Sequence, residues 1–174
     1  MVHAIDEFKA EGESAKAITF DEELVERVGS SNQRLMDRQS ILMASTALRL
    51  SQKNSLKGGR GLGLYCVLEI LDHDLEVANI LRDSNLSLTQ KFQNEIRPTR
   101  YLQTMPCVQA FWSALAVQAQ GPVRIFFQSS FAEKAAMEQA ELDLQDGLCE
   151  TAIILNVALG PERVSGRVLT RTGD

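Results

Sequence analysis

The 174-residue sequence lacks several features that mark particular protein classes. No apolar stretch approaches the roughly 18 residues that a membrane-spanning helix needs, so we expect no membrane span. Only three cysteines, Cys66, Cys107 and Cys149, and two histidines, His3 and His73, are present, and they are widely spaced without a Cys-x-x-Cys pair. A disulfide framework and a zinc site are therefore not expected, and the sequence implies no metal and no cofactor.

Signals for phosphate binding and for common hydrolytic sites are missing as well. The glycines between positions 58 and 63 precede an apolar run of strand length, whereas a dinucleotide-binding or P-loop fingerprint follows a strand and opens a helix. No His-Glu-x-x-His or Gly-x-Ser-x-Gly motif occurs. The net charge of -5 repels polyphosphate backbones, so we expect no nucleic-acid partner.

What the sequence does contain is the balance of an ordinary globular domain. Hydrophobic residues make up 44% and charged residues 24%, which excludes disorder throughout. The length suits one domain with a single core. The N-terminus is acidic and has no apolar block of the kind that a secretory signal needs, which predicts a cytoplasmic protein.

The first third of the chain predicts an arm, a helix and a strand. Residues 1–30 are acidic and weakly patterned, and we expect a loosely attached arm in which only residues 17–20 have the character of a short strand. From Leu35 onward, apolar residues return at three- and four-residue intervals, which predicts a helix ending near Asn54. The apolar run 62–68, after a glycine-rich connection, predicts a buried strand.

Three more helices are predicted before residue 122. Two short helices are expected over 73–83 and 87–96, the second capped by Ser87. Pro106 suits the first turn of a longer helix that ends at Gly121-Pro122. The apolar residues expected on one side of that helix are Val108, Phe111, Trp112, Leu115 and Ala116.

The last third of the chain determines the predicted fold class. A strand over 123–127, a helix from Ser130 to Gln145 with Gly147 as its stop, and an apolar strand over 151–159 are typical of a crossover between parallel strands. We therefore predict a layered α/β fold with a mostly parallel sheet flanked by helices. The domain is expected over residues 31–160, and the arginines in residues 161–174 suit an edge strand or tail.

The turn 128–131, where a strand ends and a helix begins, is the most informative place for chemistry. Backbone N–H groups at a helix start are unpaired and carry partial positive charge, which favours nucleophiles and acyl oxygens. Ser129 or Ser130 either serves such chemistry or simply caps the helix. Cys107 is either a reactive thiol or a small apolar filler at the start of its helix. The acids expected on a solvated helix face are Glu133, Glu138, Glu141 and Asp143.

Several segments stand in the order found in one enzyme family. They are Leu35-Met36-Asp37-Arg38, the alanine-containing helix 42–48, the strand 61–68, Thr104-Met105-Pro106-Cys107, Gly121-Pro122, the strand 123–127, Ala140, Gly147 and the strand 152–159. Over roughly residues 34–160 this ordered set resembles the N-terminal half of β-ketoacyl synthases, the condensing enzymes of fatty acid and polyketide synthesis, and their chain-length-factor relatives. The resemblance implies a thiolase-like half-domain.

Departures from the family pattern bear on function. Counting nine residues on from Gly121, the position of the family's nucleophilic cysteine falls on Ser130, and a serine needs a dedicated base. Cys107 takes the place of a family asparagine. The family's two histidines belong to a C-terminal half that lies beyond this sequence, and its first strand is missing or reduced to residues 16–20. The resemblance therefore implies that this chain does not form carbon–carbon bonds by itself.

Association is the role that the resemblance implies instead. In complete condensing enzymes two similar halves cover each other's apolar layers, so a lone half needs a partner. The leading hypothesis is a non-catalytic, chain-length-factor-like subunit that forms a homodimer, or a heterodimer with a full-length ketosynthase, and that meets an acyl carrier protein. The side chains expected to shape an acyl tunnel or the interface are Phe111, Trp112, Gln128, Ser129, Ser130 and Phe131.

Two other hypotheses stay open at this point. The chain is alternatively an acyltransferase or thioesterase-type enzyme that uses Ser130 or Cys107, with a base supplied by a partner chain. It is otherwise a homodimeric small-molecule binding module with no connection to acyl chains.

Overall fold

In a computed structural model of the chain, residues 2–11, 22–68, 79–82, 85, 87–91, 102, 105–157 and 163–171 are described. Their centre is a five-stranded sheet with the order β1-β5-β4-β2-β3. β2 pairs in parallel with β3 and β4, whereas β5 runs antiparallel to β4 and β1. The strands are β1 (Val2–Glu11), β2 (Leu62–Leu68), β3 (Val123–Phe127), β4 (Thr151–Val157) and β5 (Arg163–Arg171).

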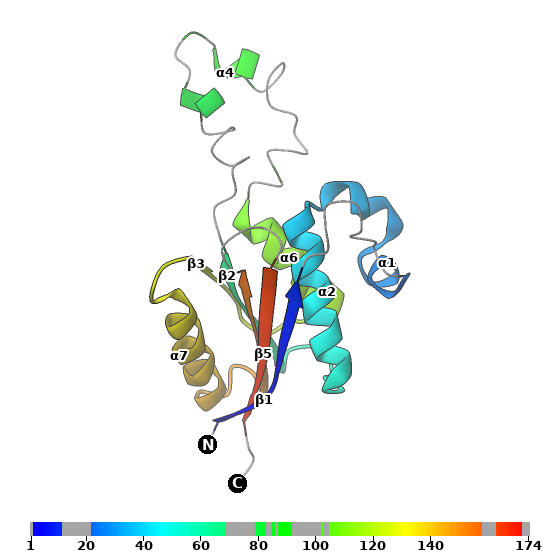
Figure 1. Cartoon of the computed structure of the whole chain (residues 1–174), viewed down its shortest axis with the longest axis vertical. Coiled ribbons are helices and arrows are strands. Elements are labelled where there is room, and N and C mark those ends of the chain that lie inside the picture. Colours follow the sequence, from blue (N-terminus) through cyan, green and yellow to red (C-terminus); the bar gives the residue numbers. More distant parts are fainter. Residues whose placement is uncertain are drawn as a thin grey trace.

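Helices cover both faces of this sheet (Figure 1). On one face, α2 packs against the sheet and against α6, and α1 contacts α6 in turn; α7 covers the other face. None of the helices in the described ranges has both the length and the apolar character that a bilayer span requires. The helices are α1 (Glu22–Val28), the 3₁₀ helix η1 (Ser30–Leu35), α2 (Arg38–Lys53), α4 (Leu88–Gln90), α6 (Pro106–Val117) and α7 (Ala132–Gln145).

The first long helix, α2, confirms the helix predicted from apolar spacing. It begins where the Asp37 carboxylate accepts a hydrogen bond from the backbone N–H of Ser40 at 2.6 Å, as an N-cap residue does. It ends where the backbone N–H and the side-chain amide of Asn54 both donate to the carbonyl of Leu50, at 3.1 Å and 2.9 Å. Its buried apolar side chains belong to two clusters, one against the sheet and one shared with α1 and α6.

Two apolar layers hold the sheet in place. β2 is buried at every position because helices lie on both of its sides, so its apolar residues need not alternate with polar ones. On the α2 and α6 side, the core includes Met43, Leu50, Leu64, Cys66, Ala110, Ile153 and Leu155. On the α7 side, it includes Tyr65, Val67, Ala136, Ala140, Leu144 and Ile154.

Two glycines sit where neighbouring chain segments approach too closely for a side chain. A Cβ at Gly121 would lie 2.6 Å from the carbonyl oxygen of Leu62, so the end of the α6 connection packs directly on the backbone at the start of β2. A Cβ at Gly166 would lie 2.5 Å from Cδ1 of Leu50. Glycine at position 166 therefore lets α2 pack tightly on the sheet.

The predicted layered α/β fold is confirmed, but the sheet is only partly parallel. β3, β2 and β4 form the predicted parallel portion, with α7 following β3 and preceding β4. β5 and β1 add an antiparallel portion. Only residues 158–162 separate β4 from β5, which is too few for the crossover that a parallel pair needs.

The expectations for the two ends of the chain are wrong. Residues 2–11 are not a loose arm, because Val2–Glu11 forms β1 and pairs with β5 along its length. β5 is consequently an interior strand rather than an edge strand, with Val168 and Leu169 buried. Its Arg167 lies 3.5 Å from the Glu133 carboxylate of α7, so this arginine is an ion-pair partner and does not mark a solvated edge.

The predicted helix start at Ser87 is confirmed by a reciprocal cap. The Ser87 hydroxyl accepts from the backbone N–H of Gln90 at 3.2 Å, and the Gln90 side chain accepts from the backbone N–H of Ser87 at 2.9 Å. Predictions for residues 16–20, 73–78, 83, 92–99, 104, 158–162 and 172–174 fall outside the described residues.

Candidate functional site

The helix α6 is apolar on nearly every side, and its residues divide among different environments. Trp112 and Ala116 are buried in a core that they share with α1 and α2. Phe111 is 53% exposed, although its ring meets that of Trp112 edge to face with centroids 5.0 Å apart. The sequence predicted Phe111 and Trp112 on one side of the helix. The structure separates them, because Trp112 packs toward α1 and α2 whereas Phe111 faces outward.

Phe111 lines an open groove of about 860 Å³ between α6 and β3. The groove is also lined by Cys107 and Leu115 of α6 and by Val123 and Ile125 of β3. None of the described residues that line it is an Asp, Glu, Lys or Arg, in a chain in which such residues make up 24%. An apolar surface of this kind is typical of an interaction site.

The strand β3 forms one edge of the sheet, and its outer side has no partner among the described strands. The backbone N–H of Leu64 donates to the carbonyl of Pro122 at 2.8 Å, and that of Gln128 donates to the carbonyl of Leu68 at 2.8 Å, so even-numbered residues face β2. Because backbone groups alternate along a strand, Val123, Ile125 and Phe127 direct their N–H and C=O groups to the free edge.

The side chains of these outward-facing residues lie on the α6 side of the sheet. Ile125 packs against the core beneath α6, and residues of the same parity share a face of the strand. Val123 and Phe127 are 45% and 55% exposed. The free edge and the groove beside α6 therefore form one continuous apolar surface, which we name the α6–β3 surface and define by Phe111, Val123, Ile125 and Phe127.

The turn 128–131 follows β3 at the carboxyl end of the parallel strands, and all four of its residues are exposed. The Ser129 hydroxyl accepts from the backbone N–H of Phe131 at 3.4 Å. α7 begins at Ala132 with Phe131 as its N-cap residue, so Ser130 does not cap the helix. Within the described part of the chain, the Ser130 hydroxyl makes no hydrogen bond.

The structure does not bring Ser130 together with the α6–β3 groove. Ser130 lines a separate depression on α7, together with Glu133, Lys134 and Met137. His73 lies outside the described residues, and His3 lies opposite Thr170 on β1, at the other edge of the sheet from β3. The position of Ser130 after β3 agrees with the sequence analysis, but its expected neighbours Phe111 and Trp112 lie elsewhere.

Cys107 is exposed at the start of α6, where it lines the groove. The interpretation of Cys107 as an apolar filler is therefore wrong, because a filler is buried by the residues it packs against. Cys66 and Cys149 are buried, and burial raises the pKa of the Cys66 thiol to about 12. Of the three thiols, Cys107 is the one open to solvent and to a ligand in the groove.

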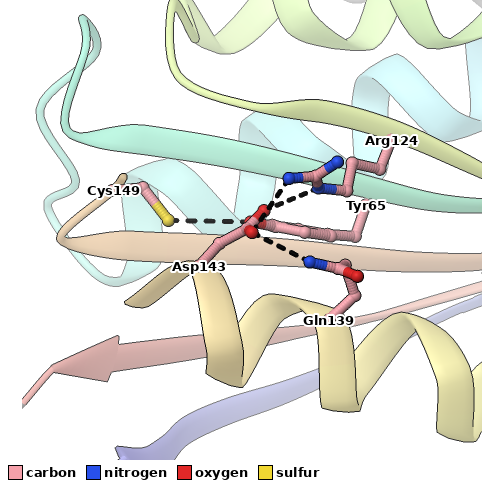
Figure 2. A network of polar contacts seen from close by, with 5 residues as sticks. All are labelled: Tyr65, Arg124, Gln139, Asp143 and Cys149. Carbon is pink, nitrogen blue, oxygen red and sulfur yellow. Dashed lines mark hydrogen bonds and ion pairs between the residues drawn. The ribbon is translucent and has the colours of Figure 1, made fainter. Parts of the chain in front are cut away.

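A buried polar network ties α7 to the sheet (Figure 2). Asp143, which is 2% exposed, accepts from the Tyr65 hydroxyl at 2.7 Å. Arg124 donates to the same carboxylate through Nε at 2.6 Å and Nη2 at 2.9 Å, and Gln139 donates through Nε2 at 2.9 Å. The Cys149 sulfur lies 3.7 Å from the Tyr65 hydroxyl oxygen.

The hydrogen-bond donors around Asp143 keep its carboxyl group in the charged form. Burial alone raises the pKa of a carboxyl, but hydrogen bonds from Arg124, Tyr65 and Gln139 and the charge of Arg124 outweigh it, so the pKa of Asp143 lies below its usual value. Burial, reinforced by the hydrogen bond to Asp143, raises the pKa of Tyr65. Asp143 is therefore a charged acceptor with both oxygens engaged, which is a structural role.

The network overturns the expectation that Asp143 lies on a solvated helix face. Two features of the sequence could have indicated this network. Arg124 is the one charged residue in the apolar strand Val123–Phe127, and a tyrosine within a buried strand needs a partner for its hydroxyl. The network lies toward the amino ends of the parallel strands, so it is separate from the turn 128–131 at their carboxyl ends.

No family sequence profile matches the chain, and no curated protein sequence matches it either. Its structure, however, is similar to solved structures of condensing enzymes. A β-ketoacyl synthase from Burkholderia phymatum has a TM-score of 0.64 at 13% identity, covering 83% of this chain and 45% of that one. A ketosynthase in complex with its chain length factor, from Xenorhabdus doucetiae, gives 0.66 at 12% identity, covering 99% and 79%. The chain has the ketosynthase fold.

A third similar structure is a type II polyketide acyl carrier protein in complex with its ketosynthase bound to the hexaketide, with a TM-score of 0.61 at 12% identity. It covers 87% of this chain and 51% of that one. The chain thus spans about half the length of two of these relatives. At these identities the likeness is one of fold, and it confirms the fold implied by the resemblance of residues 34–160.

Proposed function

We propose that the chain is a non-catalytic ketosynthase-like subunit that works by association with a condensing enzyme. The observation that carries this proposal is the α6–β3 surface, which is apolar, uncharged and open along an edge of the sheet. The partner classes follow from the similar structures, in which a ketosynthase is in complex with a chain length factor or with an acyl carrier protein.

Exposure of large apolar side chains supports an association surface. Phe111 and Val123 line the same groove and are 53% and 45% exposed, and Phe127 lies on the same face of β3 with 55% exposed. Covering such side chains stabilises a complex by roughly 25 cal/mol for each Å² of apolar surface removed from water. A partner that covers this surface therefore gains affinity without having to pair a charged group.

The surroundings of Ser130 support a role without catalysis. A serine nucleophile needs a base within hydrogen-bond reach. Of the three carboxylates that line the depression with Ser130, Glu133 is the nearest in sequence, and the others are Glu138 and Glu141. Glu133 accepts from the Asn156 side chain at 3.0 Å and lies 3.5 Å from Arg167, and Glu138 lies 3.5 Å from Lys134. Glu133 is therefore engaged by other residues, and we do not assign Ser130 a nucleophilic role.

The groove beside α6 is where this subunit would influence chain length. Phe111 and Cys107 project from α6 into space that a growing acyl chain could occupy, and added bulk in a filled pocket costs roughly 1–3 kcal/mol. Gln128, Ser129 and Phe131 stay proposed interface residues at the end of β3. Trp112 is buried away from the groove, and we no longer propose it as a lining residue.

Co-purification tests the proposal. The tagged chain is co-expressed with a complete ketosynthase and an acyl carrier protein from the same genome, and we expect a complex that survives size-exclusion chromatography. Phe111→Glu should lower its recovery at least tenfold, whereas Leu142→Glu, which changes a 51% exposed residue on α7, should leave it unchanged. Elongation of a malonyl substrate by the chain alone contradicts the proposal, as does equal recovery of both variants.

A second candidate is acyl transfer through Cys107, which its exposure at the groove favours. The Cys107 thiolate would attack the thioester of an acylated carrier protein, forming a new thioester and releasing the carrier thiol. Intact mass after incubation with that carrier distinguishes the candidates. An adduct that disappears in Cys107→Ser favours acyl transfer through this thiol, one that disappears in Ser130→Ala favours the serine, and no adduct favours the non-catalytic subunit.

A further inference from the structure

We propose that a small pocket between α1 and the C-terminal ends of α2 and α6 binds a monocarboxylate with a short apolar chain. The pocket has a volume of about 280 Å³, and we name it the Arg27 pocket, defined by Arg27, Ser51, Ser55 and Gln118. None of the four residues that define the α6–β3 surface lines it. The inference therefore goes beyond the proposed function and does not depend on it.

Polar side chains without a partner converge on this pocket from three segments of the chain. In the described part of the chain, five such side chains line it and make no hydrogen bond or ion pair: Arg27, Ser51, Gln52, Ser55 and Gln118. Ser51 is the most informative, because it is only 9% exposed and a buried hydroxyl is normally hydrogen-bonded. An unpaired hydroxyl in the wall of a pocket indicates a ligand that supplies its partner.

The charge of the Arg27 pocket favours an anion. Among the described residues that line it, Arg27 is the only charged one, in a chain whose net charge is -5. Arg27 is exposed on α1 and has no ion-pair partner in that part of the chain. A guanidinium presents paired N–H donors that match the two oxygens of a carboxylate, so Arg27 is available to bind an external acid.

Two features favour a carboxylate over a phosphate. One arginine balances a carboxylate, whereas a phosphate group carries about 1.5 to 2 negative charges at pH 7. Both α2 and α6 end at the pocket, and the partial negative charge of a helix C-terminus opposes a dianion further. A single carboxylate meets less opposition, because the carbonyls of Ser51, Gln52 and Leu115 already accept backbone hydrogen bonds at 2.8, 3.0 and 3.1 Å.

The rest of the wall suits a short hydrocarbon chain. Leu48, Leu56, Ala116 and Val117 line the pocket beside its polar groups. Three of them, Leu48, Ala116 and Val117, are buried and belong to the core, so their positions are fixed by packing. A few apolar atoms on a molecule whose carboxylate meets Arg27 would contact this side of the pocket. A carboxylate alone would leave it in contact with water.

Backbone contacts hold the wall of the pocket in place. The backbone N–H of Gly59 donates to the carbonyl of Gln118 at 2.7 Å. A Cβ at Gly58 would lie 2.7 Å from Cβ of Gln118 and 2.9 Å from the carbonyl oxygen of Val117, so the connection after α2 packs directly on the end of α6. A pocket that is already formed costs a ligand little ordering of the chain.

Titration of the wild-type chain with sodium hexanoate at neutral pH, followed in ¹H–¹⁵N spectra, tests the assignment. We expect saturable shifts at the backbone amides of Ser51, Ser55 and Gln118. Hexanamide, which has the same chain without the charge, and inorganic phosphate should each bind at least about tenfold more weakly. Equal binding of hexanamide, tighter binding of phosphate, or no saturable binding of hexanoate overturns the inference.

Variants locate the carboxylate. Arg27→Gln should lower the affinity for hexanoate at least about tenfold, whereas Arg60→Gln, at an exposed arginine outside the pocket, should leave it unchanged. Ser51→Ala should weaken binding severalfold without lowering stability in urea, because its hydroxyl has no partner to lose in the free chain. Far-UV circular dichroism checks that the variants fold. Shifts confined to the α6–β3 surface, or binding insensitive to both Arg27→Gln and Ser51→Ala, contradict the proposal.

The two proposals fail separately. A chain that binds a ketosynthase in a manner sensitive to Phe111→Glu but does not bind hexanoate refutes the pocket ligand and leaves the proposed function in place. A chain that binds hexanoate through Arg27 but forms no complex with a ketosynthase refutes the proposed function and supports the pocket ligand.

Discussion

Removing the Asp143 carboxylate should loosen the attachment of α7 to the sheet. Asp143→Ala deletes the acceptor of four hydrogen bonds, one from Tyr65, two from Arg124 and one from Gln139. Tyr65 is fully buried and loses its carboxylate partner, while Arg124, whose side chain is 40% exposed, can turn to water. The loss should therefore be dominated by the tyrosine hydroxyl.

The size of the effect follows from these exposures. A buried hydroxyl left without its acceptor costs about 1–3 kcal/mol. The ion pair with a partly exposed arginine adds about 1 kcal/mol or less once screening by solvent is counted. Asp143→Ala should thus lower the free energy of unfolding by about 1–4 kcal/mol. Tyr65→Phe should cost about 1 kcal/mol, because it removes one hydrogen bond and leaves Asp143 paired with Arg124.

Urea unfolding followed by the fluorescence of the single, buried Trp112 measures these differences. Glu138→Gln is the matched control on the same helix. Its carboxylate is 62% exposed and pairs with Lys134 at 3.5 Å, so its loss should cost a few tenths of a kcal/mol. The reasoning is refuted if Asp143→Ala and Glu138→Gln destabilise the protein equally.

Three further predictions follow from the same side chains and backbone contacts. The pKa of Asp143 is lower in the folded chain than the roughly 3.9 of an unfolded aspartate. The stability that charged Asp143 gives to the folded chain is therefore fully present above about pH 4, and it is lost as the pH falls through the pKa that Asp143 has in the folded chain. Urea titrations below about pH 4 should accordingly show a steeper loss of stability in the wild type than in Asp143→Asn, and parallel curves would contradict this. A thiol reagent should modify Cys107 at once in the native protein and Cys66 and Cys149 only after denaturation, with the fast phase absent from Cys107→Ser. Gly121→Ala should destabilise by about 1–3 kcal/mol, since its Cβ would press on the backbone of Leu62, whereas Gly61→Ala meets only the flexible Glu150 side chain and should cost less in the same unfolding assay.

The elements with local signals were predictable from the sequence. Pro106 opens α6, Asp37 and Asn54 bound α2, and the uninterrupted apolar run of Leu62–Leu68 marks a strand covered on both faces. β1 was not predictable, because Val2–Glu11 mixes acidic and apolar residues and its partner β5 lies at the other end of the chain. Local sequence patterns do not show pairing between segments that are distant in the chain. Because the pairing of β1 with β5 is of this kind, β5 is expected at the edge of the sheet from sequence alone.

The position of the turn 128–131 after β3 was predictable, whereas the residues expected beside it were not. The turn after β3 lies where the apolar strand and the following helix predicted it. Helical spacing predicts Phe111 and Trp112 on the same side of their helix. In the structure only Phe111 faces the groove, and Trp112 is buried. The helical spacing alone groups Asp143 with the solvated acids of α7, because its partner Arg124 comes from a strand 19 residues earlier in the sequence.

Residue-resolved hydrogen exchange on the chain mixed with the proposed ketosynthase partner tests the central claim most directly. If association occurs through the free edge of β3, the amides of Val123 and Ile125 should exchange slowly in the complex and fast in Phe127→Glu. The amides of Arg124 and Phe126 face β2 and should stay slow in both, which provides an internal control. Fast exchange at Val123 and Ile125 in the wild-type complex would contradict the claim.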